Sequence, residues 1–393
     1  MSPGPSPLHG TQPHVTQKDV ARRAGVSPSI VSYVINNGPR AVSPETRQRV
    51  LDAIEQLAYR PNRHAQLLLR SRAPVEQATR EFGVIVGGTP ALFTRPFYGA
   101  ILSGIYQEAQ RLHMRIRFLQ FLGDLRDPLL FNELVHPEEI SGLLLFAIDG
   151  SLDLPPDEAD ALRASVVERA RERIDNIVCV ERKWMNLPAV VFDRVEAAYL
   201  AVSRLICLGH RRIAYAGAQD DRLFGYRNAL LDHDISYSAS LVLDDGSANT
   251  PADGYRHAHA LAALFPRPTA VFACSDEIAT GLIDGLHEQG CRVPEDVALV
   301  SVDDIPLAAH LRPRLTTVHV PAAEMGGYAV RMLHDWVMHP AQPPVSVILP
   351  IHLAVRDSCG ASLDSQGGDK GAAALVPPQP STLDNSSSTP NRL

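Results

Sequence analysis

The chain has 393 residues, of which 45% are hydrophobic and 21% charged, and its net charge is −7. These values are typical of a globular protein with a substantial core, and the length allows two or three domains beyond a small module. They exclude a membrane protein, because no stretch approaches the roughly 18 to 20 apolar residues that a spanning helix needs. The first 13 residues lack the basic start and apolar core of a signal peptide, so we expect a cytoplasmic protein.

The cysteines argue against disulfides and metal sites. They are scattered along the chain, with no CxxC pair and no histidine at metal-binding spacing. This pattern is typical of reduced, mostly buried thiols, and we expect no metal and no cofactor. The five are Cys179, Cys207, Cys274, Cys291 and Cys359.

Residues 14–62 predict a unit of three short helices. Thr16, with an acid three residues later, can cap the start of the first helix, and Gly25 ends that helix at a tight turn. The Ser-Pro pairs at 27–28 and 43–44 each combine an N-cap with a proline at the first helical position. The spacing therefore predicts a helix-turn-helix followed by a third helix.

The second of these helices has two distinct faces. An apolar stripe begins at Ile30 and leaves the opposite face to four uncharged polar residues: Ser29, Ser32, Tyr33 and Asn36. Such side chains can approach base edges in a major groove, as a recognition helix requires. The same capping and periodicity would occur in any three-helix bundle, but the charge favours DNA. Residues 14–73 carry ten Lys and Arg against four acids, a net charge of +6 that leaves −13 for the rest of the chain.

Residues 63–72 contain three consecutive leucines and are too few to hold a helix alone, since isolated helices shorter than about 12 to 15 residues are marginal in water. This segment needs a partner to fold. The alternative to a DNA partner is a linker whose leucines pack on the core.

After residue 80, short apolar runs alternate with helical stretches in two successive sets, which predicts two doubly wound α/β lobes in series. A ligand should bind where the carboxyl ends of the strands of the two lobes face each other across a cleft. The predicted strands are 82–86, 116–121, 142–146, 177–180 and 190–192, then 212–216, 241–243, 270–273 and 297–302. The predicted helices include 99–112, 193–208, 254–264 and 277–289.

Two further segments complete the chain. The helix 322–336 is a candidate dimer surface, although Met325, Met332 and Trp336 at helical spacing are more typical of core. Residues 359–393 are rich in Ser, Pro, Gly and Asn and, like residues 1–13, are expected to be disordered. The tail offers no tetramerising leucine heptad, so we expect a dimer.

Several sequence blocks closely resemble the LacI/GalR family of transcription factors. The N-terminal blocks are VTQKDVA, AGVS, VSYVIN and YRPN, and RLFGYR, LGHRRI, RVPEDV and DDIP match the family's effector domain, which is similar to periplasmic sugar-binding proteins. The resemblance covers about residues 15–358. It implies a helix-turn-helix DNA-binding domain at 14–62, a hinge helix at 63–72 and a two-lobed effector-binding and dimerisation domain at 80–358.

The resemblance also implies which residues contact DNA. The positions of Pro28, Ser29 and Tyr33 carry much of the base readout in the family, and Leu68 aligns with the residue that wedges between base pairs in the minor groove. Pro28 departs from the usual residue and offers no side-chain hydrogen bond. The full expected set is Thr16, Pro28, Ser29, Ser32, Tyr33, Asn36, Arg63 and Leu68.

For the effector cleft, the family's ligand groups align with Phe97, Tyr98, Glu181, Arg222, Ser275 and Asp303. Arg222 offers five donors in a fork, Asp303 offers acceptors, and the aromatic pair can stack on a sugar face or a heterocycle, with core packing as the alternative. Ser275 stands where many members of the family have Asn. Arg95 likewise stands where the family commonly has Asn before the proline. We expect Arg182 to pair across the seam between the lobes, and Asp304 to cap the next turn.

Together these features predict a homodimeric repressor that binds a near-palindromic operator under the control of a small molecule, sugar or nucleobase-like. Whether the effector releases DNA or strengthens binding stays open. Paired acids, and a serine near acids, suggest an enzyme only superficially. No histidine lies close to them in the sequence, and no phosphate-binding glycine loop follows a strand, so we expect no catalytic residues. The alternative is a cytosolic small-molecule-binding protein with a degenerate DNA-binding module.

Overall fold

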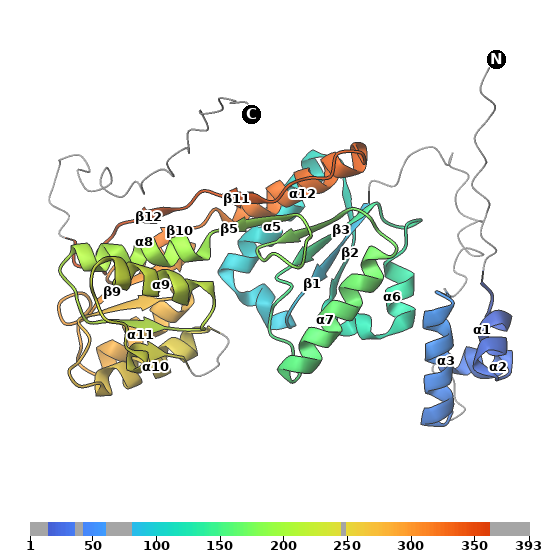
Figure 1. Cartoon of the computed structure of the whole chain (residues 1–393), viewed down its shortest axis with the longest axis horizontal. Helices are drawn as coiled ribbons and strands as arrows, with labels where there is room; N and C mark the ends of the chain where they lie inside the picture. The colour runs from blue at the N-terminus through green and yellow to red at the C-terminus, as the bar shows by residue number, and fades with distance from the viewer. Residues whose placement is uncertain (1–14, 36–41, 60–80, 245–248, 362–393) are drawn as a thin grey trace, which may run out of the picture.

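The computed structural model describes residues 15–35, 42–59, 81–244 and 249–361. They form a small helical unit and two α/β lobes that follow one another along the long axis of the molecule (Figure 1). The hinge segment predicted at 63–72, the N-terminal residues 1–13 and most of the predicted tail lie outside the described residues.

The helix-turn-helix unit contains the three predicted helices. They pack around a small core in which Val20, Val31, Val50 and Ile54 are fully buried. Gly25 adopts a left-handed φ of 66° at the turn after the first helix, a conformation that glycine adopts without strain. The helices are α1 (Gln17–Ala24), α2 (Pro28–Ile35) and α3 (Pro44–Gln56).

The N-terminal lobe is a parallel six-stranded sheet of order β11-β5-β4-β3-β1-β2 with helices on both faces. Successive residues of a strand point to opposite faces: Val84 lies in the core under α5 and α12, and its neighbour Ile85 lies in the core under α6 and α7. The strands are β1 (Glu81–Val86), β2 (Arg115–Phe121), β3 (Gly142–Phe146), β4 (Ile177–Val180), β5 (Ala189–Phe192) and β11 (Val347–Leu349). The helices are η1 (Pro90–Thr94), α5 (Pro96–Arg111), η2 (Leu122–Arg126), α6 (Pro128–Leu134), α7 (Pro156–Arg171) and α12 (Ala322–Met338).

The C-terminal lobe repeats this architecture with the order β12-β10-β9-β8-β6-β7, in which only the edge strand β12 runs antiparallel to its neighbour. Helices α8 and α9 pack together on one face, and α10 and α11 on the other (Figure 1). The strands are β6 (Ile213–Ala216), β7 (Val242–Leu243), β8 (Ala270–Ala273), β9 (Ala298–Asp303), β10 (Thr316–His319) and β12 (His352–Ala354). The helices are α8 (Arg194–Cys207), α9 (Asp221–Asp232), η3 (Ala239–Leu241), α10 (Pro251–Ala263), α11 (Asp276–Glu288) and η4 (Pro306–Ala309).

The chain crosses between the lobes three times: from β5 to α8, from β10 to α12 and from β11 to β12. The two predicted α/β lobes are therefore confirmed, but they are not simply in series, because α12 and β11 return to the N-terminal lobe. Met325 on α12 is fully buried and belongs to the core, the second of the two interpretations that its spacing allowed.

The predicted start of the tail is wrong. Cys359 is only 1% exposed and belongs to the core of the C-terminal lobe, so the ordered chain extends past residue 358. The cause is Ser358, whose hydroxyl donates to the carbonyl of Leu299 (2.7 Å) and accepts from the amide of Thr316 (2.9 Å).

All five cysteines are free, and only Cys207 is exposed. Within the described residues, no helix is long and apolar enough to cross a membrane.

Candidate functional site

The outer face of α2 carries the predicted DNA-reading residues that the structure describes. Pro28 and Ser29 are exposed, and Ser32 and Tyr33 are half-buried on the same short helix. The helix begins at Pro28, as the sequence predicts. Asn36, the last residue of the predicted face, lies outside the described residues, as do Arg63 and Leu68.

Thr16 has a clear local role at the start of α1. The carboxylate of Asp19 accepts from the Thr16 hydroxyl (2.6 Å) and from the Thr16 backbone amide (2.9 Å), and these hydrogen bonds lower the pKa of Asp19. The predicted pairing of Thr16 with the acid three residues later is thus present. Helix capping accounts for this arrangement without DNA.

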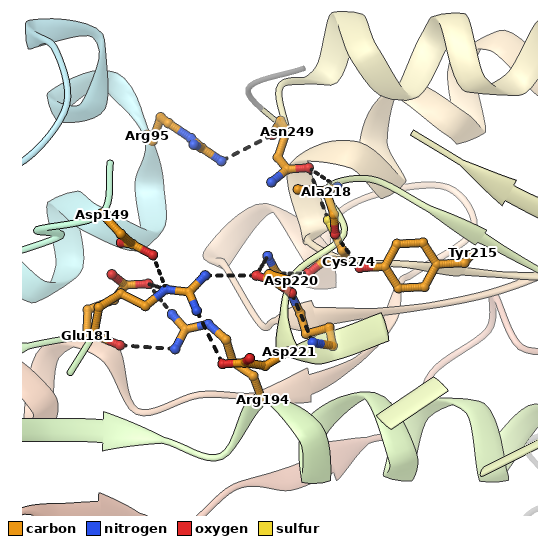
Figure 2. A network of polar contacts seen from close by, with 12 residues as sticks. Arg95, Asp149, Glu181, Arg194, Tyr215, Ala218, Asp220, Asp221, Asn249 and Cys274 are labelled. Carbon is orange, nitrogen blue, oxygen red and sulfur yellow. Dashed lines mark hydrogen bonds and ion pairs between the residues drawn. The ribbon is translucent and has the colours of Figure 1, made fainter. Parts of the chain in front are cut away.

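The second candidate site lies between the lobes, at the carboxyl ends of the strands. On the N-terminal side, the bends after β3 and β4 place Asp149 and Glu181 at the seam (Figure 2), and Arg182 follows Glu181 in the chain. Both bends contain a residue with positive φ: Ala147 at 47° and Glu181 at 76°. Non-glycine residues adopt such φ only where the surrounding structure enforces it, and such strain often clusters at ligand-binding sites.

Two arginines of the N-terminal lobe reach across the seam. Arg182 lies 2.8 Å from Asp149 on its own lobe and 2.8 Å from Asp220 on the other (Figure 2). This confirms the prediction that Arg182 pairs across the seam. Arg95 donates to Glu277 of α11 (2.7 Å) and to the carbonyl of Asn249 (3.1 Å). The lobes are therefore joined directly by charge-assisted hydrogen bonds.

Arg222 lies at the start of α9, where it is only 8% exposed. Its guanidinium forks onto Asp220, with Nε at 2.9 Å and Nη2 at 2.7 Å, and Nη1 donates to the carbonyl of Cys274. Burial raises the pKa of Asp220, but the charge and hydrogen bonds of Arg222, together with Arg182, outweigh burial and lower it. Arg222 is at the seam as predicted, with Asp220 as its main partner.

Glu181 forms a buried pair with Arg194 of α8. Arg194 donates through Nη2 to Glu181 Oε1 and through Nη1 to the Glu181 carbonyl (3.0 Å), and both residues are almost fully buried. Burial raises the pKa of Glu181, and Arg194 opposes this shift. The second carboxylate oxygen, Oε2, is buried without a hydrogen-bond partner among the described residues. An unsatisfied buried acceptor is costly unless something binds it.

Asp303 ends β9 with φ of 123° and is 8% exposed. Burial and the neighbouring Asp276 raise its pKa well above its ordinary value, and these effects outweigh the opposing charges of Arg222 and Arg95. Asp276 itself is fully buried and accepts from the hydroxyls of Ser301 and Thr317, each at 2.6 Å.

One expectation at this end of the seam is wrong, and a second residue has a further role. Asp304 does not cap the next turn: its carboxylate lies 2.6 Å from Arg356 Nη2 and 2.9 Å from His319 Nδ1, and these charged and polar partners replace a backbone amide. Ser275 is buried and caps α11 by accepting from the amide of Ile278 (3.3 Å). Its hydroxyl thus already has a structural role.

The aromatic pair packs at the start of α5. Phe97 is 7% exposed and meets Tyr98 and Phe192 edge-to-face, with ring centroids 5.5 and 6.3 Å apart. Tyr98 is half-buried beneath the guanidinium of Arg95, which lies 5.2 Å from the ring centroid. Phe97 therefore packs in the core, which was the alternative to a ligand contact. Tyr98 lies next to Arg95, the arginine that joins the two lobes.

The sequence did not single out the acidic and amide residues that complete the network: Asp149, Asp220, Asn249 and Glu277. Several of their contacts join segments far apart in the sequence, as with Arg95 and Glu277, 182 positions apart, although Asp220 also pairs with Arg222 two residues along. The one available signal was Arg95 itself, which stands where the family commonly has Asn.

Comparison with known proteins agrees with this architecture. Residues 16–62 match the family described as bacterial regulatory proteins, lacI family, and residues 202–359 match a periplasmic binding protein-like domain. The chain is 30% identical over 353 residues to the ribose operon repressor of Haemophilus influenzae, covering 87% of this chain and 98% of the relative. It is 34% identical over 351 residues to the transcriptional regulator CelR of Thermobifida fusca, with coverage of 87% and 98%.

Solved structures give the same result. A complex of the transcriptional regulator CelR with cellobiose superposes with a TM-score of 0.61 at 31% identity, covering 88% of this chain and all of the other. The lac repressor dimer bound to operator gives a TM-score of 0.60 at 24% identity, with coverage of 88% and 99%, and supports the fold. The chain belongs to the lacI family of bacterial regulatory proteins and is a DNA-binding transcriptional regulator.

Proposed function

We propose that this regulator is a homodimeric repressor whose affinity for a near-palindromic operator is controlled by a sugar bound between the two lobes. The polar face of α2, on which Ser29 is exposed, and the basic charge of residues 14–73 support DNA reading. The names of its relatives, a ribose operon repressor and a regulator solved with cellobiose, support sugar control. The match over residues 16–62 favours this function over a binding protein with a degenerate DNA-binding module.

The observation that carries the sugar proposal is the pair of buried acceptors that face the seam from opposite lobes. Glu181 Oε2 has no partner among the described residues, and Asp303 ends its strand beside Arg222 and Arg95. Carboxyl oxygens accept hydrogen bonds, so a neutral polyhydroxyl ligand can donate to the unpartnered Glu181 Oε2 and reach the Asp303 carboxyl without adding a buried charge. We assign ligand contacts to Glu181, Arg222 and Asp303, with Tyr98, Phe97 and Ser275 shaping the site.

For DNA, we assign base contacts to Pro28, Ser29, Ser32, Tyr33 and Asn36, and a DNA contact to Thr16. Arg63 and Leu68 are proposed to contact the minor groove at the centre of the operator. A two-fold dimer presents two such surfaces, which requires a palindromic site.

Control follows from the geometry of the seam. A sugar that binds one lobe arrangement more tightly than the other shifts the equilibrium by that difference in affinity. We propose that sugar binding favours the lobe arrangement that holds DNA weakly, so the sugar acts as an inducer.

A thermal-shift screen of the full chain against sugars, sugar phosphates and nucleobases tests the ligand class. A ligand at 100 times its Kd stabilises the folded state by about 2.7 kcal/mol, which gives a shift of several degrees. Glu181→Gln should lose most of the shift, whereas Glu295→Gln, which makes the same change at an exposed position of the chain, should keep it. A shift produced only by nucleobases, or one equally large in both variants, would contradict the proposal.

A further inference from the structure

The N-terminal lobe contacts the helix-turn-helix unit directly, at the C-terminal end of α3 (Figure 1). Leu129 of α6 packs against the core of that unit. Asn132, one turn further along α6, is fully buried, and its Nδ2 lies 3.2 Å from the carbonyl of Ile54 and 3.4 Å from that of Tyr59. We call Leu129, Asn132, Arg169 and Arg173 the docking face.

The chemistry of this face fits the end of a helix. The last turn of a helix leaves carbonyl groups without helical partners, and the helix dipole makes that end negative. The Ile54 carbonyl already accepts from the amide of Tyr59 (3.0 Å), and the Asn132 amide adds a second donor to it and also donates to the Tyr59 carbonyl just beyond the helix. On α7, Arg169 Nε lies 3.2 Å from the carboxylate of Glu55 in the last turn of α3.

The orientation of the Asn132 amide is fixed from within the lobe. Its Oδ1 accepts from Nη2 of Arg173 (2.6 Å), which leaves Nδ2 pointing at α3. The guanidinium groups of Arg169 and Arg173 lie over the Phe131 ring, 4.0 and 4.9 Å from its centroid, so packing on α6 holds both cations. The lobe thus holds a donor and a cation ready for a helix C-terminus.

The contact leaves the DNA-reading face of the unit uncovered. Pro28 and Ser29 are exposed in the docked arrangement. The crevice beside the contact, about 250 Å³, is lined from the unit's side by Val34, Ile35, Arg47 and Leu51, which do not belong to the predicted reading face. Docking and base contact therefore use different surfaces of the same unit.

We propose that the docking face binds the C-terminal end of α3 and holds the helix-turn-helix unit on its own lobe in the orientation used on DNA. The lobe then restricts the positions open to the unit, so less conformational freedom remains to be lost when DNA binds. The statement about orientation rests on the proposed DNA-binding function, whereas the docking itself does not.

The decisive variant is Asn132→Asp. It keeps an acceptor for Arg173, so the lobe retains that contact, but it replaces the donor with a carboxylate against helix carbonyls, which is repulsive. Asn186→Asp is the matched control, because it makes the same charge change at an exposed position of the same lobe, away from α6. Glu55→Arg opposes Arg169 from the side of the unit and leaves the lobe unaltered.

Hydrogen exchange of the full chain without DNA tests the docking. The last turn of α3 and helix α6 should exchange at least tenfold faster in Asn132→Asp and in Glu55→Arg, and at the wild-type rate in Asn186→Asp. Wild-type rates in both docking variants would overturn the proposal. A loss of protection across the whole N-terminal lobe in Asn132→Asp would show misfolding, in which case Glu55→Arg decides.

Anisotropy titrations with a duplex selected by the wild-type chain from a random library test the orientation. We expect binding by Asn132→Asp to be about tenfold weaker than by Asn186→Asp. Equal or tighter binding, with faster exchange, would overturn the claim that the docked orientation is used on DNA. Failure to select any duplex would contradict the proposed function and leave the exchange result to decide the docking.

Discussion

Replacing Arg95 with alanine should shift the two lobes towards a more open arrangement in the absence of any ligand. The Arg95 guanidinium donates to Glu277 (2.7 Å) and to the carbonyl of Asn249 (3.1 Å), and the side chains of Arg95 and Glu277 are 21% and 12% exposed. A hydrogen bond to a charged group contributes about 1.5 to 3 kcal/mol. Since about 1.4 kcal/mol changes an equilibrium tenfold, the closed-to-open ratio should fall by about 10- to 100-fold.

Single-molecule FRET between the lobes measures this ratio. Cys207 on the C-terminal lobe is exposed and the other four cysteines are buried, so one dye can be attached there and the second at Asp157→Cys, an exposed position at the start of α7. A double-mutant cycle with Glu277→Ala then isolates the contact between Arg95 and Glu277. We expect a coupling free energy of about 1 kcal/mol or more, within the range for residues in direct contact.

Arg292→Ala is the control for removing an arginine from an ion pair. Arg292 pairs with Asp296 four residues later on the surface, where the side chains are 70% and 30% exposed. Such exposed pairs contribute little to stability, and both partners of this one lie in the C-terminal lobe. The control should therefore leave the FRET distribution unchanged. The reasoning fails if Arg95→Ala gives the wild-type distribution or if the cycle yields no coupling.

Two further predictions concern stability. Burial raises the pKa of Asp276 to about 6 from its ordinary 3.8, so the folded chain holds this proton more tightly than the unfolded chain. Its stabilising contribution is complete below pH 3.8 and is lost as the pH rises through 6, by about 3 kcal/mol at 1.36 kcal/mol per pKa unit. Denaturant titrations between pH 4 and 8 should show this loss in wild type relative to Asp276→Asn, and parallel profiles would contradict it. Separately, a Cβ on Gly104 would lie 1.8 Å from the carbonyl of Ala323, so Gly104→Ala should separate α5 from α12 and lower the free energy of unfolding by about 1 to 3 kcal/mol. Gly99→Ala on the same helix meets nothing within 4 Å and should be neutral or stabilising in the same melts; equal losses would refute the packing argument.

Much of the fold was predictable because its signals are local. The strands at 142–146 and 270–273 were predicted to the residue, since both are short apolar runs buried on both faces. The helix starts at Pro28 and Pro44 follow from serine caps and first-turn prolines. These features depend on neighbouring residues alone.

The rest depends on distant partners. The periodicity of α12 predicts a helix but does not say which sheet it covers, and the chain returns it to the first lobe. Asp304 precedes a turn, as a cap would, but Arg356, 52 positions away, is its partner. Asn132 carries no signal in the sequence, because its carbonyl partners are more than 70 positions away.

The central claim is that occupancy of the interlobe site and binding to DNA are thermodynamically linked. Anisotropy titrations of the selected duplex, with and without the sugar that gives the largest thermal shift, test it directly. We predict that the sugar weakens DNA binding and that the duplex weakens sugar binding by the same factor, as linkage requires. A duplex affinity that is identical at zero and at saturating sugar would contradict the account.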